Sequence, residues 1–375
     1  MGRETSDEGN AQAEGTPRRH GGGGGDGRDR ARATGTPAQA ATTNVWRTEY
    51  YNTGVSGQMN GVVAYSKGDG WAVGNTYKGE NIVYSLDVLH WNGSKWYSVS
   101  VPGSSGYSAN SIAGQDGVDV WVFAENAAGD WKAFRFDGSR WHTVTIPSDV
   151  GTSDVVVLGA SNVWSVGGAS CTETNGKLTG CATPIWHWNG STWRSYTIDA
   201  DITGLGGTSA SNLRAAGVTG QTSANGNGTL VEYQWSGSSW AKKSIPSIRV
   251  ADDASVATDS TSDVWLSSWT AGASTVTALH WNGRAWGTVK SPTSVAATPS
   301  LVPDGSGGAW FGTLAHWTGR AWVNTTPPPS SWSGGAIFSM VKIPGMSGSY
   351  WGAAQVSKGS SSTTHPSVMI YGPLP

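Results

Sequence analysis

Charge, cysteine and long apolar runs are all scarce in this chain of 375 residues. Charged residues make up 13% of the chain, the formal net charge is −2, and lysine and arginine form no stripe. We therefore do not expect nucleic acid as a partner. No apolar run reaches the roughly 18 residues that a membrane-spanning helix needs. Phosphate-binding glycine loops, zinc-binding helix motifs and nucleophile elbows are missing too, so no single segment carries a catalytic signature.

The two cysteines, Cys171 and Cys181, lie close together in one glycine-containing segment. They either form a disulfide, whose small ring would be worth about 3 kcal/mol by loop-closure entropy, or remain two free thiols. We predict the disulfide. It favours an extracytoplasmic location, because disulfides persist in oxidising compartments.

Tryptophan and glycine, in contrast, are abundant, with 22 and 54 residues. Many tryptophans belong to one short segment that recurs along the chain, first at residues 89–96 with the sequence LHWNGSKW. The Asn-Gly, Asp-Gly or Ser-Gly pair at its centre, flanked by aromatic and β-forming residues, predicts a tight β-hairpin. Near-copies occupy residues 134–141, 186–193, 233–240, 279–286 and 315–322.

A second recurring position lies upstream of each hairpin and usually holds a tryptophan followed by small or β-branched residues. Its seven occupants are Trp71, Trp121, Trp164, Arg214, Trp265, Trp310 and Trp351. Each unit thus predicts four short strands, a to d, in about 36 to 54 residues, which is the spacing of propeller blades. We predict an all-β fold, a seven-bladed β-propeller.

The seventh unit ends after its third strand. Residues 45–50 resemble the fourth strands of the other units and have no strands a to c before them. We predict that this N-terminal strand completes blade 7 and closes the ring, which removes the free edges of an open sheet.

Residues 1–43 differ in composition, with many glycines, arginines and acids and almost nothing apolar. We expect a disordered tail or the remnant of a leader, because residues 37–41 resemble the end of a secretory leader but no apolar segment precedes them. Residues 44–375 should form the propeller, which we expect to be secreted and monomeric.

The connections between strands b and c are long and irregular in most units, whereas the a–b and c–d turns are short. In a four-stranded blade the b–c connections share one face with the connections between blades; we call it the elaborated face, and the opposite one the plain face. Binding usually resides on loops held by a rigid scaffold, and aromatic rings suit the C–H faces of sugars. We predict ligand contacts at Tyr77, Tyr107, Trp131, Trp269 and Trp332. Each of these rings can also simply cover the root of a loop.

Acidic residues near the starts of the innermost strands should meet at the mouth of the central channel. If the protein is an enzyme, we expect Asp154, Asp252 and Asp253 to be its catalytic carboxylates. If the mouth holds Ca²⁺, Asp154, Asp201 and Asp252 would be its ligands. A solvated channel mouth explains the same acids without either role, and the sequence requires no cofactor.

Histidines precede the strand-c tryptophan in four units, at His90, His187, His280 and His316. Equivalent positions in different blades are spread round a ring, so they cannot share one metal ion. We interpret them as hydrogen-bonding residues of the blades.

The Asn-Gly-x-x-Trp hairpin resembles the Asp-box of sialidase-type propellers, although the interval from Asn92 to Trp96 is one residue shorter and the arginine triad of sialidases has no obvious counterpart. Residues 45–371 are similar to the Trp-rich secreted propellers of actinobacteria, in which a proline follows the hairpin. Such prolines are Pro102, Pro147, Pro246 and Pro292. Propeller lectins are similar in being Trp-rich and free of cofactors. These resemblances imply the fold and export and transfer no catalytic residue.

Two functions follow from these observations. The one we favour is a non-catalytic secreted recognition module that binds a glycan or a protein surface through the long b–c loops. The alternative is a propeller enzyme, a glycan lyase, hydrolase or cyclase, that acts at the mouth of the channel.

Overall fold

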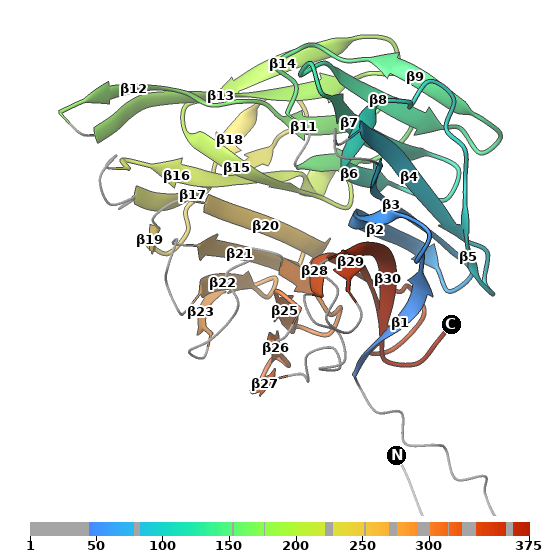
Figure 1. Ribbon diagram of the computed structural model, residues 1–375. Helices are drawn as coiled ribbons and strands as arrows, with labels where there is room; N and C mark the ends of the chain where they lie inside the picture. The colour runs from blue at the N-terminus through green and yellow to red at the C-terminus, as the bar shows by residue number, and fades with distance from the viewer. Residues whose placement is uncertain are drawn as a thin grey trace, which may run out of the picture. The chain divides into compact units, whose positions relative to one another are not determined.

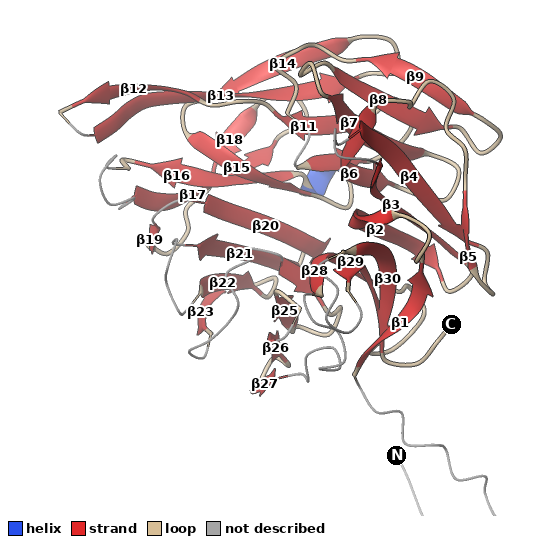
Figure 2. Cartoon of the chain, in the orientation of Figure 1, coloured by secondary structure: helices blue, strands red, loops and turns tan. Residues whose placement is uncertain are grey.

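The computed structural model describes residues 45–78, 83–151, 154–175, 177–221, 228–250, 253–269, 276–291, 301–313, 315–324, 335–357 and 363–375. In this part of the chain the fold is all-β apart from one short 3-10 helix, η1 (Ala210–Asn212) (Figure 2). The strands form seven antiparallel sheets. The predicted seven-bladed β-propeller is therefore confirmed (Figure 1).

Each blade has four main strands, which follow one another from the channel outward. Blades 1 and 2 contain β2 (Ser56–Ser66), β3 (Asp69–Lys78), β4 (Val83–Trp91), β5 (Trp96–Ser98), and β6 (Tyr107–Gly114), β7 (Val120–Asn126), β8 (Trp131–Phe136), β9 (Trp141–Thr145). Blades 3 and 4 contain β10 (Val155–Val157), β11 (Val163–Val166), β13 (Lys177–Trp188), β14 (Trp193–Ile198), and β15 (Asp201–Gly206), β16 (Arg214–Thr219), β17 (Gly228–Trp235), β18 (Trp240–Lys242), with β19 (Arg249–Val250) beside β17. Blades 5, 6 and 7 contain β20 (Asp253–Ser260), β21 (Asp263–Trp269), β22 (Thr277–Trp281), β23 (Trp286–Lys290), then β24 (Leu301–Pro303), β25 (Ala309–Phe311), β26 (Ala315–Trp317), β27 (Trp322–Asn324), and β28 (Ala336–Lys342), β29 (Tyr350–Val356), β30 (His365–Tyr371), β1 (Trp46–Tyr51).

The ring is closed at the N-terminal strand, as predicted. Strand β1 pairs with β30, so that Trp46 lies opposite Tyr371. The Trp46 side chain is fully buried, and its Nε1 donates a hydrogen bond of 3.0 Å to the carbonyl oxygen of Thr313 in blade 6. The innermost strands of successive blades contact one another, and β28 of blade 7 contacts β2 of blade 1. Every described blade sheet therefore has its outer strand d.

A stack of tryptophan on histidine recurs in four of the seven blades and holds the blade to its a–b turn. In blade 5 the imidazole of His280 lies 4.0 Å from the ring centre of Trp265, in parallel, and its Nε2 bonds the Asp263 carboxylate at 2.9 Å. Equivalent stacks occur at Trp71–His90, Trp164–His187 and Trp310–His316. The structural role predicted for these histidines is confirmed.

The hairpin between strands c and d is tight, as predicted, and the backbone amide of Asn92 donates to the carbonyl oxygen of Lys95 at 3.3 Å. Trp91 pairs with Trp96, which leaves a turn of the four residues 92–95. The Asn92 Oδ1 atom accepts hydrogen bonds from the amides of Ser94 and Lys95, both at 3.1 Å, and Gly93 has a φ of 89°. The Asn side chain thus replaces a backbone carbonyl in closing the turn, and only the glycine needs the left-handed region.

The b–c connections are more regular than the sequence suggested, because the strands continue into them. In blade 1, β3 and β4 stay paired as far as Lys78 and Val83. In blade 3, the extra strand β12 (Ser170–Thr174) folds back on β13, and a disulfide joins Cys171 to Cys181. The predicted disulfide is confirmed. Among the described residues no helix is long and apolar enough to cross a membrane.

Candidate functional site

Of the five aromatic residues predicted to contact a ligand, Tyr77 lines a cavity. Tyr107 is only 7% exposed and packs against Phe134, so its ring offers little surface to a ligand; burial in the blade core corrects that prediction. Trp131 is partly buried against the core between blades 2 and 3. Trp332 lies outside the described residues, and of Trp269 only the backbone is described.

The cavity that Tyr77 lines opens on the elaborated face, where strands b and c of blade 1 extend past blade 2. We call it the blade 1 cavity, and its volume is about 450 Å³. Its lining residues are Gln58, Asn75, Tyr77, Tyr84 and Ser108.

Two tyrosine rings form one wall of the blade 1 cavity. Tyr77 and Tyr84 are directly opposite each other in the pairing of β3 with β4, and their rings meet edge to face with centroids 5.9 Å apart. Tyr84 is 38% exposed. The pairing fixes both rings at low conformational cost, because each side chain has only two rotatable angles.

Amide side chains lie beside the tyrosines on the same face of the blade 1 sheet and are held by a chain of hydrogen bonds. Gln58 Nε2 donates to Asn60 Oδ1 at 2.7 Å, and Asn60 Nδ2 donates to the carbonyl oxygen of Ala109 at 2.6 Å. The amide of Ala109 donates to Asn75 Oδ1 at 2.5 Å. The chain joins blade 1 to blade 2, so the polar groups beside the tyrosines are preorganised.

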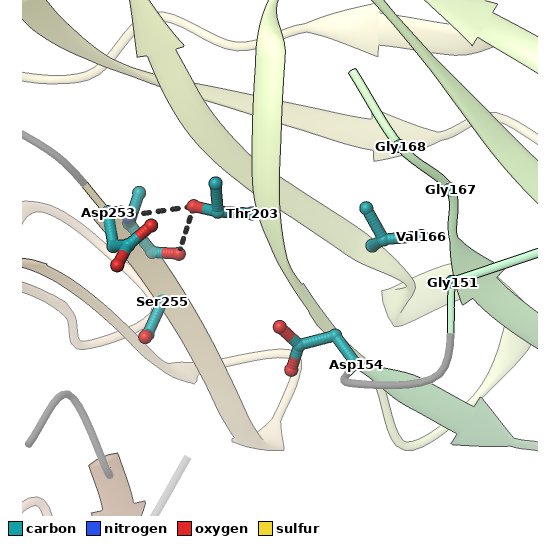
Figure 3. A pocket seen from close by; sticks show the side chains of 9 residues that line it. Gly151, Asp154, Val166, Gly167, Gly168, Thr203, Asp253 and Ser255 are labelled. Carbon is teal, nitrogen blue, oxygen red and sulfur yellow. Dashed lines mark hydrogen bonds between the residues drawn. The ribbon is translucent and has the colours of Figure 1, made fainter. Parts of the chain in front are cut away.

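A second cavity, of about 470 Å³, lies at the mouth of the channel, and we call it the channel-mouth cavity. It is lined by Gly151, Asp154, Val166, Gly167, Gly168, Thr203, Asp253, Ala254 and Ser255 (Figure 3). The Thr203 Oγ1 atom both donates to the carbonyl oxygen of Ala254 and accepts from its amide, each at 2.8 Å, which ties blade 4 to blade 5.

The acids predicted to meet at this mouth do so in part. Asp154 precedes β10 and Asp253 begins β20, and both line the channel-mouth cavity. Burial, together with the negative charge of Asp253, raises the pKa of Asp154 to about 7, and the same two causes raise the pKa of Asp201. Asp154 therefore changes protonation near neutral pH. Asp252 lies outside the described residues.

No three histidine, cysteine or acidic side chains among the described residues are arranged to hold a metal ion. The predicted ligands Asp154, Asp201 and Asp252 are not all described, so calcium at the channel mouth stays a prediction.

Sequence reasoning missed Gln58, Asn75, Tyr84 and Ser108. One signal was available: Tyr84 follows Tyr77 at the interval at which a hairpin returns, so the two rings were candidates to pair. Gln58 and Asn75 are paired within the blade 1 sheet, and only the packing of blade 2 against blade 1 brings Ser108 to the same cavity.

Seven antiparallel sheets, each with four main strands, surround a channel and have cavities on both faces, which defines the class of protein as a β-propeller. No protein-family model and no curated protein sequence matches the chain.

Solved structures give matches at the level of the fold. YCF48 bound to D1 peptide is 13% identical with a TM-score of 0.52, over 88% of this chain and 97% of that one. The β-propeller domain of Cps50 (Swd1) from Myceliophteria thermophila is 11% identical with a TM-score of 0.52, over 86% and 99%. A fucose-recognising, six-bladed lectin from Aleuria aurantia is 14% identical with a TM-score of 0.45, over 76% and 100%. At these identities the first two matches support the fold alone.

Proposed function

We propose that the protein is a non-catalytic recognition module that binds a glycan through the blade 1 cavity on the elaborated face. The observation that carries the proposal is the pairing of Tyr77 with Tyr84 beside fixed amide groups. Apolar ring faces next to convergent donors and acceptors suit a sugar, whose C–H faces pack on rings and whose hydroxyls form hydrogen bonds. The cavity volume, about 450 Å³, is in the range of small-ligand sites.

A binding screen of the full chain on glycan and peptide arrays tests this proposal. YCF48, a propeller of similar fold, was solved bound to a peptide, which is why peptides belong in the screen. We expect a defined set of glycans to bind and to be lost on Tyr84→Ala. Peptides that bind while every glycan fails would replace the glycan with a protein surface as the ligand.

A matched control exists in the same blade. Tyr97 on β5 is as exposed as Tyr84, at 38%, but its hydroxyl bonds His90 and it lies outside the cavity. Tyr97→Ala should leave glycan binding unchanged. Equal losses in the two variants would indicate general damage to blade 1 and contradict the proposed site.

A second candidate function, catalysis on a glycan, rests on the channel-mouth cavity. Asp154 and Asp253 line it together, and a carboxyl that changes protonation near neutrality can serve as a general acid or base. Turnover of a glycan substrate that is abolished by Asp154→Asn and kept by Tyr84→Ala would favour this function. Binding that survives Asp154→Asn with no turnover would favour the recognition module.

The proposal also includes secretion of the protein and a calcium site at the channel mouth. The Cys171–Cys181 disulfide supports an oxidising location, which localisation of the protein in its own cells would test. Running the arrays with Ca²⁺ and with EDTA tests the channel mouth as a calcium site, because a metal-dependent ligand would be lost with EDTA.

A further inference from the structure

Blade 4 departs from the repeat at three positions that face one space on the plain face. Arg214 takes the strand-b position that holds tryptophan in the other six blades. Opposite it on β17, Gln234 takes the position of the stacked histidine, and Arg214 pairs with Gln234 as Trp164 pairs with His187 in blade 3.

The third departure lies two residues before Gln234. Glu232 pairs with Ala216, which is the register position of Ile185 opposite Val166 in blade 3. Equivalent positions in other blades hold apolar residues: Val88, Ala133, Ala278 and Val368. Blade 4 thus combines a buried acid, a buried base and an amide where its neighbours are aromatic or aliphatic.

The missing indole leaves a cavity between blades 4 and 5. In blade 3, Trp164 packs against the c–d aromatic pair of the next blade, Trp235 and Trp240, with ring centroids 4.8 and 5.8 Å away. The corresponding pair of blade 5 is Trp281 and Trp286, and it lines a cavity of about 470 Å³ instead. We call this space the blade 4–5 cavity; it is also lined by Arg214, Glu232, Gln234, Lys243, Ser244, Thr261, Ser262 and Gly283.

The charged pair in the wall is held in place but not fully satisfied. Arg214 is 7% exposed and Glu232 is 1% exposed. Arg214 Nη1 bonds Glu232 Oε1, and Arg214 Nε donates to Asn212 Oδ1 at 3.2 Å. Among the described residues no group bonds the second carboxylate oxygen, Oε2, of Glu232. Burial raises the pKa of Glu232, against the opposing charge of Arg214.

The fold alone gives no reason for this arrangement. A buried ion pair loses hydration that apolar side chains would not lose, and at the position of Glu232 blades 1, 2, 3, 5 and 7 hold apolar residues. The three departures also meet in one cavity rather than being scattered. Such a cluster of polar side chains beside two indoles has the composition of a ligand site.

We propose that the blade 4–5 cavity binds the pyranose ring of a glycan, seated where the other blades have the strand-b indole. A pyranose offers C–H faces to Trp281 and Trp286, and it carries around its rim the hydroxyls that Arg214, Gln234 and Lys243 can bond. A hydroxyl is also a donor for the unsatisfied Glu232 oxygen. This site lies on the plain face and is independent of the blade 1 cavity.

The test gives blade 4 the side chains of blade 3. The triple variant is Arg214→Trp, Glu232→Ile, Gln234→His. Its turn residue Asn212 corresponds to Asn162 of blade 3, which accepts hydrogen bonds from Trp164 and His187, so Asn212 can accept the same bonds from the new side chains. Methyl glycosides of hexoses, deoxyhexoses and hexuronic acids are titrated into the full chain and followed by saturation-transfer NMR and tryptophan fluorescence. Both chains carry Tyr84→Ala, which removes the ligand of the blade 1 cavity. In that background we expect binding with the natural blade 4 and its complete loss in the folded triple variant.

A milder pair of variants keeps the proposal falsifiable if the triple variant does not fold. Lys243 lines the cavity, whereas its neighbour Lys242 does not, and both are exposed. Lys243→Ala should weaken the selected glycoside about tenfold, and Lys242→Ala should leave its affinity unchanged. Both lysine variants are measured in the Tyr84→Ala background, so that binding at the blade 1 cavity does not contribute to the signal. The proposal is overturned if no glycoside binds, if binding survives in the triple variant, or if indole binds and the glycosides do not.

Discussion

Replacing Asp154 by asparagine should stabilise the propeller at alkaline pH and not at acid pH. Burial and the charge of Asp253 raise the pKa of Asp154 from 3.8 to about 7 in the folded protein. A carboxyl with a raised pKa binds its proton more tightly when folded. Its ionisation therefore costs stability as the pH rises from about 4 through 7.

The size of the effect follows from the displacement of the pKa. At about 1.4 kcal/mol for each pH unit, ionised Asp154 costs the folded state at most about 4 kcal/mol. Solvent still reaches part of the Asp154 side chain and screens its charge. We therefore expect roughly half of this cost, about 2 kcal/mol. Asparagine has the same shape and no charge, so Asp154→Asn removes the cost.

Urea unfolding of both proteins at pH 4.5 and pH 8.5 measures the difference. The free energy of unfolding of Asp154→Asn should exceed that of the natural protein by about 2 kcal/mol at the higher pH and match it at the lower. Asp253→Asn should recover a smaller part, because burial is the larger cause of the shift. A stability difference that is the same at both values would refute the assignment of Asp154 as a buried, proton-binding group.

Three further predictions concern the scaffold. Hydrogen bonds from His316 and its turn outweigh burial and hold the pKa of Asp304 well below its ordinary value. Asp304→Asn should therefore cost about 2 kcal/mol at pH 7 in urea unfolding, and this cost should shrink as the pH falls below about 4 and disappear only where Asp304 is protonated in the folded protein. Replacing Cys171 and Cys181 by serine opens a ring closed across 10 residues, so we expect the free energy of unfolding to fall by at most about 3 kcal/mol. Proteases should also cleave the variant faster at β12, and equal cleavage rates in the variant and the natural protein would contradict a local role of the disulfide. Trp46→Ala empties a fully buried site in blade 7 and should cost about 3 to 5 kcal/mol in the same unfolding assay, whereas a loss under 1 kcal/mol would contradict closure by β1.

The blade repeat was predictable because its signals are local. The hairpin at Asn92 and Gly93 forms through contacts within a few residues, so it can be seen wherever its sequence recurs. The closing strand could be found by counting, since Trp46 begins a strand d with no strands a to c before it. The tight hairpin was predicted, but the two hydrogen bonds that the Asn92 side chain accepts within it were not.

The candidate sites were less predictable because they depend on packing between blades. Gln58 and Ser108 belong to different blades and line one cavity only when blade 2 stands against blade 1. Tyr107 looked like an exposed ring from its loop position, but the same packing buries it. Arg214 and Gln234 were visible as exceptions to the repeat, yet the sequence did not show that Glu232 joins them.

Titration of an array-selected glycan into the full chain tests the central claim, that the blade 1 cavity is a recognition site. Calorimetry on the natural protein, Tyr84→Ala and Tyr97→Ala compares two tyrosines of equal exposure in one blade. We predict that Tyr84→Ala lowers the affinity at least tenfold and that Tyr97→Ala leaves it unchanged. An affinity that Tyr84→Ala does not alter would contradict the account.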